Sequence, residues 1–282
     1  MVNDAQIEHW NSEESGHWVD HHERYDTMLA PFIDQLLAAV GLRADDRVLD
    51  VGCGCGATTL AAGAEVRSGT ALGVDISAPM LNVARQRAMA ASLPSVAFAK
   101  GDAQTHPFVA GGFDVVISRF GVMFFEDPEA AFNGLTASMA PGGPMAFVCW
   151  QEMAQNPFVL VPGVALAEHV PLPDLGPSEA PGMFALADPE RIRSILSDAG
   201  LDEVSVDPLH REILLGGGGS LDDAIQFLRY GGMGRAVLDG VDTSTQDRVE
   251  IAVSEALAPY LTPEGVRIGS SAWLVADIKP AG

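Results

Sequence analysis

The stretch "RVLDVGCGCGATTLAAGAE", Arg47 to Glu65, joins an apolar run to a helical pattern through a turn rich in glycine. The run "RVLDV" is short and almost continuously apolar, which is typical of a strand buried on both faces. Glycines in the turn let the backbone approach a ligand closely, because no side chain stands in the way. The turn is therefore a predicted binding site, and the nature of its ligand decides the function.

Three kinds of ligand compete for this turn: a metal ion, a phosphate group and a cofactor that carries positive charge. Cys53 and Cys55 are only two residues apart, and no second cysteine or histidine pair lies nearby in the sequence to complete a tetrahedral set. We therefore expect no metal here. The two cysteines are expected to be small residues of a tight turn.

The phosphate hypothesis has more support than the metal hypothesis. Gly52, Gly54 and Ala57 fit the dinucleotide pattern G-x-G-x-x-G/A, and Asp75 lies at a suitable distance downstream to bind a ribose hydroxyl. Asp50 argues against this hypothesis. A carboxylate at the start of the loop repels a pyrophosphate and favours an ammonium or sulfonium group.

Apolar runs and helical patterns alternate from Arg47 onward. Strands are predicted at 47–51, 70–75, 95–100, 113–118, 144–150 and 271–278. Ser77, Asp127 and Asp188 stand where they can cap the helices that follow them. Strands that alternate with helices predict an α/β fold with a doubly wound parallel sheet.

Several motifs, taken in order, resemble one known family. "VLDVGCGCG" at 48–56 is similar to the glycine-rich first motif of class I S-adenosylmethionine-dependent methyltransferases, "GVDISAPML" at 73–81 to their second-strand motif, and "GDAQ" at 101–104 to their third. "FDVVISRFGVMFF" at 113–125 and "LTASMAPGGPMAFV" at 135–148 resemble their fourth strand and the glycine turn before the fifth. The N-terminal residues resemble the leader of small-molecule members. The resemblance implies a Rossmann-like, mostly parallel seven-stranded sheet with helices on both faces and a helical or irregular cap. It also implies S-adenosyl-L-methionine as cofactor and S-adenosyl-L-homocysteine as product.

The resemblance also implies a role for each matching residue. Asp50 should lie near the cofactor's ammonium group, Asp75 should bind the ribose hydroxyls, and Asp102 should accept a hydrogen bond from the adenine amino group. The other implied cofactor contacts are Gly52, Cys53, Gly54, Gly56, Ile76, Met80, Ala103, the carbonyl of Ser118, and Trp10 and Tyr25 of the leader. From the residues alone, Asp102 could instead be a turn residue, and Ile76 and Met80 could be core residues.

The methyl acceptor should bind beside the fourth and fifth strands. The implied acceptor-binding residues are Arg119, Phe120, Met123, Phe124 and Trp150, with core packing as the alternative for the apolar ones. Arg119 could orient an acidic acceptor, or pair with Asp102 or another acid. No catalytic residue is predicted, because much of the catalysis of methyl transfer can come from positioning. His21 and His22, on a predicted N-terminal helix, are more typical of solvated or packed side chains.

Four segments are predicted along the chain. Residues 1–27 form a leader, 28–150 the cofactor-binding core, 151–187 an irregular proline-rich cap segment, and 188–282 the completion of the sheet with helices inserted at about 220–262. Trp18, His22 and Tyr25 would share one helical face, and so narrow an apolar stripe gives a helix little stability of its own. We therefore expect the leader to close over the cofactor as a lid, with permanent docking as the alternative.

Composition limits the partners of this protein. Its 282 residues carry a formal net charge of -22, and the only lysines are Lys100 and Lys279, so neither nucleic acid nor a membrane surface is an expected partner. The polar, acidic N-terminus and the three cysteines favour a cytoplasmic location. We expect a methyltransferase that acts on an O, N or C atom of a small, largely apolar or aromatic metabolite. The alternatives are a nicotinamide-dependent Rossmann oxidoreductase and a non-catalytic S-adenosylmethionine-binding protein; the acceptor and the oligomeric state stay open.

Overall fold

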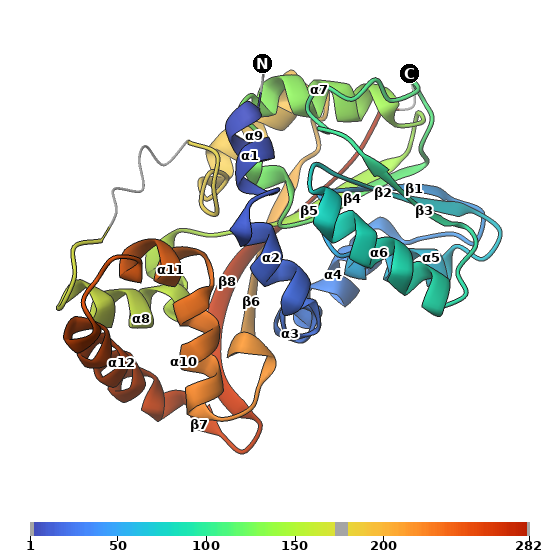
Figure 1. The fold of residues 1–282 in the computed structure, drawn as a ribbon. Helices are drawn as coiled ribbons and strands as arrows, with labels where there is room; N and C mark the ends of the chain where they lie inside the picture. Colours follow the sequence, from blue (N-terminus) through green and yellow to red (C-terminus); the bar gives the residue numbers. More distant parts are fainter. Residues whose placement is uncertain (1–2, 173–179, 281–282) are drawn as a thin grey trace.

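One mixed sheet runs through the computed structural model, which describes residues 3–172 and 180–280 (Figure 1). The strand order is β3-β2-β1-β4-β5-β8-β6. Five strands are mutually parallel: β1 (Arg47–Val51), β2 (Thr70–Asp75), β3 (Val96–Lys100), β4 (Val115–Arg119) and β5 (Pro144–Trp150). β8 (Gly265–Ile278) runs antiparallel to β5 and to β6 (Ser205–Leu214), and the short β7 (Leu261–Thr262) pairs with the start of β8. The predicted doubly wound, mostly parallel sheet is confirmed. Seven strands lie side by side in the order given, and β7 is an eighth strand that pairs only with β8.

Helices cover both faces of the sheet. In Figure 1, α4 (Ile33–Val40), α5 (Ala57–Glu65) and α6 (Ala78–Ala90) lie below it, and α7 (Pro128–Ser138) and α9 (Pro189–Asp198) lie above it. The side chains of Ser77, Asp127 and Asp188 accept backbone N–H groups at the starts of α6, α7 and α9, as predicted. Fully buried side chains between the layers include Phe32, Leu49, Ile117, Phe132 and Phe147. This packing fixes the carboxyl ends of the parallel strands, where the candidate site lies.

A group of helices forms a cap at the β8–β6 end of the sheet (Figure 1). It contains α8 (Pro157–Ala167), α10 (Leu221–Tyr230), α11 (Gly232–Leu238) and α12 (Thr243–Leu257). α8 corrects the prediction that 151–187 is irregular, because Pro157 stands at the first turn, where proline is favoured, and Pro162 is accommodated inside the helix. Residues 173–179, in the middle of that predicted segment, lie outside the described residues.

β6 forms where no strand was predicted. Pro208 and the charged residues Asp207, Arg211 and Glu212 interrupt its apolar pattern. Such a composition is typical of an edge strand, which has a free side and an exposed face. Since β6 pairs only with β8 in the sheet order, its position explains its sequence.

The N-terminal leader folds into three short helices, α1 (Asp4–His9), α2 (Glu13–Asp20) and α3 (His22–Leu29). The prediction of one helix with Trp18, His22 and Tyr25 on a single face is wrong, because the chain leaves helical geometry at His21 (φ -117°, ψ 22°). α2 packs on α6 of the core, and α3 packs on the turn at 215–217 that opens the cap insertion. The leader therefore lies between core and cap (Figure 1). Within the described residues, every helix is too short or too polar to cross a membrane.

Candidate active site

The turn between β1 and α5 is built from glycines in left-handed conformations. Gly52, Gly54 and Gly56 have φ angles of +67°, +53° and +86°. Gly52 also lies against a second backbone, because a Cβ there would meet the Gly121 Cα at 2.7 Å. The backbone N–H groups of Gly52 and Cys53 donate to the Val74 carbonyl, which ties the turn to β2. The glycines are thus required by the geometry of the turn.

Asp75 ends β2 directly beside this turn. Its Oδ2 accepts the Gly54 N–H and its Oδ1 accepts the Ser77 N–H, each at 2.8 Å. Burial raises the pKa of Asp75, and these backbone hydrogen bonds oppose the rise. Met80 is buried and is the nearest side chain to the position of a Cβ on Gly54. Asp75 therefore links the glycine turn to the start of α6.

Asp50 and Arg119 lie at the carboxyl ends of β1 and β4 and interact electrostatically. Asp50 Oδ2 accepts the Thr59 hydroxyl at 2.6 Å, while its Oδ1 has no partner among the described residues. Burial raises the pKa of Asp50 to about 7, although Thr59 and Arg119 favour the carboxylate.

The Arg119 side chain is also largely enclosed, with 11% of it exposed. Its Nη1 is buried without a partner within the described part of the chain, and its Nη2 lies 4.0 Å from Asp26 of α3. Burial lowers the pKa of Arg119, and the charges of Asp26 and Asp50 oppose that change. Arg119 thus approaches Asp26, and its predicted role in orienting an acceptor stays a prediction.

Asp102 lies in the turn after β3, the place predicted for the adenine end of a cofactor. Its Oδ1 accepts the Gln104 N–H at 3.0 Å and an N–H of the Asn3 side chain at 3.2 Å. Ala103, the next residue, is buried. Asp102 therefore contacts both its own turn and the N-terminal leader.

The leader covers this end of the sheet through several contacts. Asn11 donates to the Ile76 carbonyl and accepts the Ala78 N–H, both at 3.1 Å. Trp10 packs edge-on against Phe124 and near Trp18, with ring centroids 5.1 and 6.2 Å apart. The structure shows the leader docked, and its opening as a lid stays a prediction.

The predicted acceptor residues fall into two groups. Phe120 stacks on Trp150 with ring centroids 4.0 Å apart, and the backbone N–H of Trp150 donates to the Met123 sulfur; all three side chains are buried in the core. Phe120 has a φ of +61°, an uncommon conformation for a non-glycine residue. Phe124 is only half-buried and meets Trp10. Of the four apolar residues, Phe124 is therefore the one placed under the leader.

Some residues at this site were not predicted from the sequence. Thr59 binds Asp50, Asp26 pairs with Arg87 and with Arg119, and Asn3 binds Asp102. Thr59 lies one helical turn beyond the glycines, a position at which its hydroxyl can return to Asp50. The contacts of Asn3 and Asp26 join distant parts of the chain, and no local pattern indicates them.

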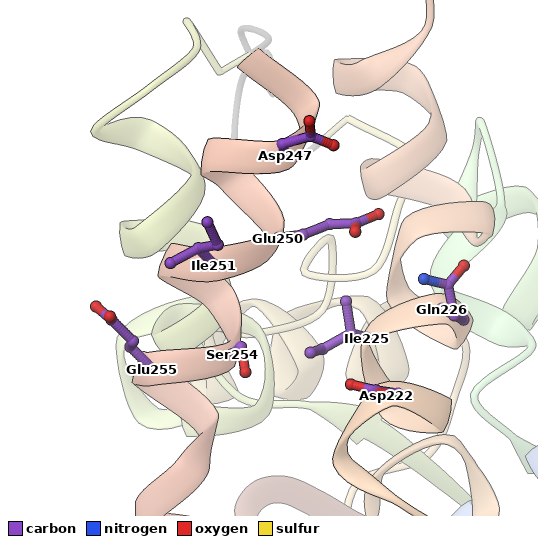
Figure 2. Close-up of a pocket in the computed structure, with 8 residues that line it drawn as sticks. All are labelled: Asp222, Ile225, Gln226, Asp247, Glu250, Ile251, Ser254 and Glu255. Carbon is purple, nitrogen blue, oxygen red and sulfur yellow. The ribbon is translucent and has the colours of Figure 1, made fainter. Parts of the chain in front are cut away.

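A cavity of about 800 Å³ lies elsewhere, between α10 and α12 of the cap (Figure 2). Eight residues line it: Asp222, Ile225, Gln226, Asp247, Glu250, Ile251, Ser254 and Glu255. None of the predicted site residues is among them, and four of the eight are acids. The cavity is therefore separate from the glycine turn and its surroundings.

Comparison with known proteins identifies the central part of the chain. Residues 48–143 match the family model described as a methyltransferase domain. This segment is a methyltransferase domain. The resemblance to class I methyltransferases inferred from the motifs is confirmed for it. The glycine turn, Asp75, Asp102 and Arg119 all lie within the methyltransferase domain.

Two relatives whose names give an activity share part of their length with this chain. It is 37% identical over 124 residues to the demethylmenaquinone methyltransferase of Thermus thermophilus, which covers 42% of this chain and 54% of that protein. It is 35% identical over 134 residues to the aklanonic acid methyltransferase DauC of a Streptomyces species, which covers 45% of this chain and 60% of that protein. The chain thus spans about half the length of the relatives it matches.

Solved structures extend the likeness in fold beyond the methyltransferase domain. A methyltransferase-like protein of Bacillus halodurans superposes with a TM-score of 0.59, covering 88% of this chain and 99% of its own at 17% identity. At that identity the comparison supports the fold alone. The sheet that carries the methyltransferase domain is therefore of a known type.

Proposed function

We propose that this protein is an S-adenosylmethionine-dependent methyltransferase that modifies a small, largely apolar or aromatic acceptor. One observation carries the proposal. Asp50 Oδ1 and Arg119 Nη1, beside the glycine turn, are buried without hydrogen-bond partners among the described residues. Unpaired burial of polar atoms is unfavourable, which favours a ligand that satisfies both. The methionine end of the cofactor carries an ammonium group for Asp50 and a carboxylate for Arg119.

The remaining site residues fit the rest of this cofactor. Asp75 already accepts two backbone N–H groups, but a carboxylate has about four acceptor positions and can also bind two ribose hydroxyls. Asp102 can accept from an adenine amino group, and the glycine turn carries no side chain that would keep the methionine chain from its backbone. A nicotinamide dinucleotide fits less well, because its pyrophosphate would lie near the Asp50 carboxylate.

The bound cofactor would supply an electrophilic methyl group carried on a sulfonium. The role of the protein is then to orient the donor, to orient the acceptor and to exclude water. Asp50, Asp75, Asp102 and Arg119 would hold the donor at three points along its length. The leader, through Trp10 and Asn11, would cover it from solvent.

Two observations support a small, flat acceptor. Trp10 of the leader packs against Phe124, at the end of the sheet where the methyl group would be, and Trp18 packs near Trp10. Relatives that share the domain are named for demethylmenaquinone and for aklanonic acid, both small molecules. We also propose a cytoplasmic location, supported by three buried free cysteines that form no disulfide.

Calorimetry with S-adenosylhomocysteine and with NAD tests the proposal. We expect binding of the first, weakened in Asp50→Asn and in Arg119→Gln, and no binding of NAD. Formation of S-adenosylhomocysteine is then measured with a panel of hydroxylated, aminated and carboxylated aromatic compounds. Cofactor binding without turnover of any acceptor would indicate a non-catalytic binding protein, and preferential binding of NAD would indicate an oxidoreductase.

A further inference from the structure

Thr59 lies in the first turn of α5, just after the glycine turn, and its side chain returns to β1. Its hydroxyl donates to Asp50 Oδ2 at 2.6 Å. Both residues are almost fully buried, with 0% of Thr59 and 1% of Asp50 exposed. A hydroxyl that donates to a carboxylate at this distance makes a charge-assisted hydrogen bond, which is stronger than a bond between neutral groups. This bond therefore fixes one of the two carboxylate oxygens.

Gly73 of β2 leaves space for this hydroxyl. It is the register partner of Asp50 in the sheet. A Cβ on Gly73 would lie 2.8 Å from Thr59 Oγ1 and 2.8 Å from the Cys53 sulfur. Glycine in the interior of a strand gives up side-chain packing and is typical of a close approach by another group. The glycine at position 73 thus fits the approach of the α5 hydroxyl to β1.

The two carboxylate oxygens of Asp50 have different surroundings. Oδ2 accepts the Thr59 hydroxyl, while Oδ1 is buried without a partner among the residues the structure describes. Because the carboxylate is planar, a hydrogen bond that holds one oxygen also restricts the direction of the other. Thr59 therefore controls where the unpaired Oδ1 lies.

Three neighbouring elements act on the charge of Asp50. Burial is the largest influence and raises the pKa of Asp50 to about 7. The hydroxyl and the backbone N–H of Thr59 in α5 oppose this rise, as does Arg119 at the end of β4, whereas Asp75 at the end of β2 adds to it. A hydrogen bond to the charged form of a group favours that form. Thr59 thus increases the fraction of Asp50 that is ionised near pH 7.

We propose that Thr59 is a positioning residue for the methyl donor, because it fixes Asp50 with Oδ1 left for the ammonium group of S-adenosylmethionine. The inference rests on the function proposed above. Thr59 need not touch the donor, since its hydroxyl proton is already donated to Asp50 Oδ2. A protonated Asp50 carries no charge and would attract an ammonium group less strongly. Thr59 would therefore set both the direction and the pH range of donor recognition.

The test uses the full chain and Thr59→Val, which replaces the hydroxyl by a methyl group. Calorimetry between pH 6 and pH 9 measures the affinity of the wild type and the variant for S-adenosylhomocysteine. Without the hydroxyl, the pKa of Asp50 should rise by about one pH unit. The variant should then bind about tenfold more weakly at pH 6 and within about twofold of the wild type at pH 9. The ratio of the two affinities is compared at each pH, because the ionisation of the ligand's own amine is the same for both proteins.

Three controls separate this role from a general loss of structure. 5′-Methylthioadenosine, a nucleoside thioether without the ammonium and carboxylate groups, should bind Thr59→Val as well as it binds the wild type. Thr59→Ser keeps a hydroxyl and should restore the wild-type pH dependence. Thr136→Val is the matched variant, since Thr136 is also buried but its hydroxyl has no partner in the described parts of the chain. It should leave both affinities unchanged.

The outcomes distinguish this inference from the proposed function. If S-adenosylhomocysteine does not bind the wild-type protein at any pH, the proposed function fails. If it binds, the inference alone is overturned by Thr59→Val that matches the wild type at pH 6, or by a loss of affinity that is equal at all pH values. An equal loss of 5′-methylthioadenosine affinity, or Thr59→Ser that behaves like Thr59→Val, would also overturn it.

Discussion

Asn3 donates a side-chain N–H to Asp102 Oδ1 across 3.2 Å, so the start of the described chain contacts the turn after β3. The backbone N–H of Asn3 also donates to Glu126 at 2.6 Å. The carboxamide of Asn3 thus offers Asp102 the same kind of donor as an adenine amino group. The Asn3 side chain and the adenine amino group of the cofactor would therefore compete for Asp102 Oδ1.

Asn3→Ala is expected to raise the affinity for S-adenosylhomocysteine about threefold to tenfold. In this variant the adenine amino group can bind Asp102 without first displacing the Asn3 side chain. Calorimetry at constant pH measures the change. Asn133→Ala is the control, since Asn133 is exposed and bonds only the Glu129 carbonyl of its own helix in the described structure. Weaker binding in Asn3→Ala would show instead that the leader helps to hold the cofactor.

Asp75→Asn is expected to lower S-adenosylhomocysteine affinity about 100-fold or more, because it removes the charge that two ribose hydroxyls would share. An asparagine retains one acceptor oxygen for the Gly54 or Ser77 N–H, so the fold should survive. Asp114→Asn, which breaks an exposed pair with Arg47 at the far end of β1, should leave affinity unchanged. Tight binding by Asp75→Asn would remove this residue from the site.

Cofactor affinity should depend on pH through Asp50. Its pKa is raised to about 7 by burial, so the free protein holds a proton there below that pH. A bound ammonium group needs the carboxylate, so affinity should rise between pH 6 and pH 8 by at most about tenfold per pH unit and then level off. Calorimetry across this range should show the rise in the wild type. A flat profile there, or an equal rise in Asp50→Asn, would contradict the assignment.

The same titration has a consequence for stability. The folded-state pKa of Asp50 lies above its usual value of 3.8, so the folded protein binds the proton more tightly than the unfolded chain. The contribution of Asp50 to stability is therefore present below about pH 4 and is lost as the pH rises toward 7.

Two neighbouring glycines should differ in their tolerance of a methyl group. Gly52→Ala should lower the free energy of unfolding by about 2–4 kcal/mol, because its φ is positive and its Cβ would overlap the Gly121 backbone. Gly54→Ala should cost only about 1–2 kcal/mol, since the nearest atom to its Cβ is the Met80 sulfur at 3.7 Å. Urea unfolding measures both. Equal decreases in the free energy of unfolding would mean that the close approach of Gly52 to Gly121 does not add to the cost of Gly52→Ala.

Local sequence patterns predicted the strands and the helix start around the candidate cofactor site. β1, β2 and β5 have the predicted bounds because they are nearly continuous apolar runs, and Ser77 caps α6 because its position at the helix start is a local property. The break at His21 and the strand β6 were missed, because tertiary packing overrides weak local signals there. The contacts of Asn3 and Asp26 were also beyond prediction. They depend on how the leader docks between core and cap, which no spacing in the sequence encodes.

Leu214 and Arg267 are partners in the register of β6 and β8, so the chain leaves the sheet and returns to it at one place. Residues 215–266, which carry α10, α11 and α12, are thus a loop-out between two adjacent strands. An insertion of this kind can be lengthened, shortened or exchanged while the strand order stays the same. Under the proposed function, this insertion can therefore change in length while the residues that would hold the donor, on β1, β2 and β4, keep their positions in the sheet.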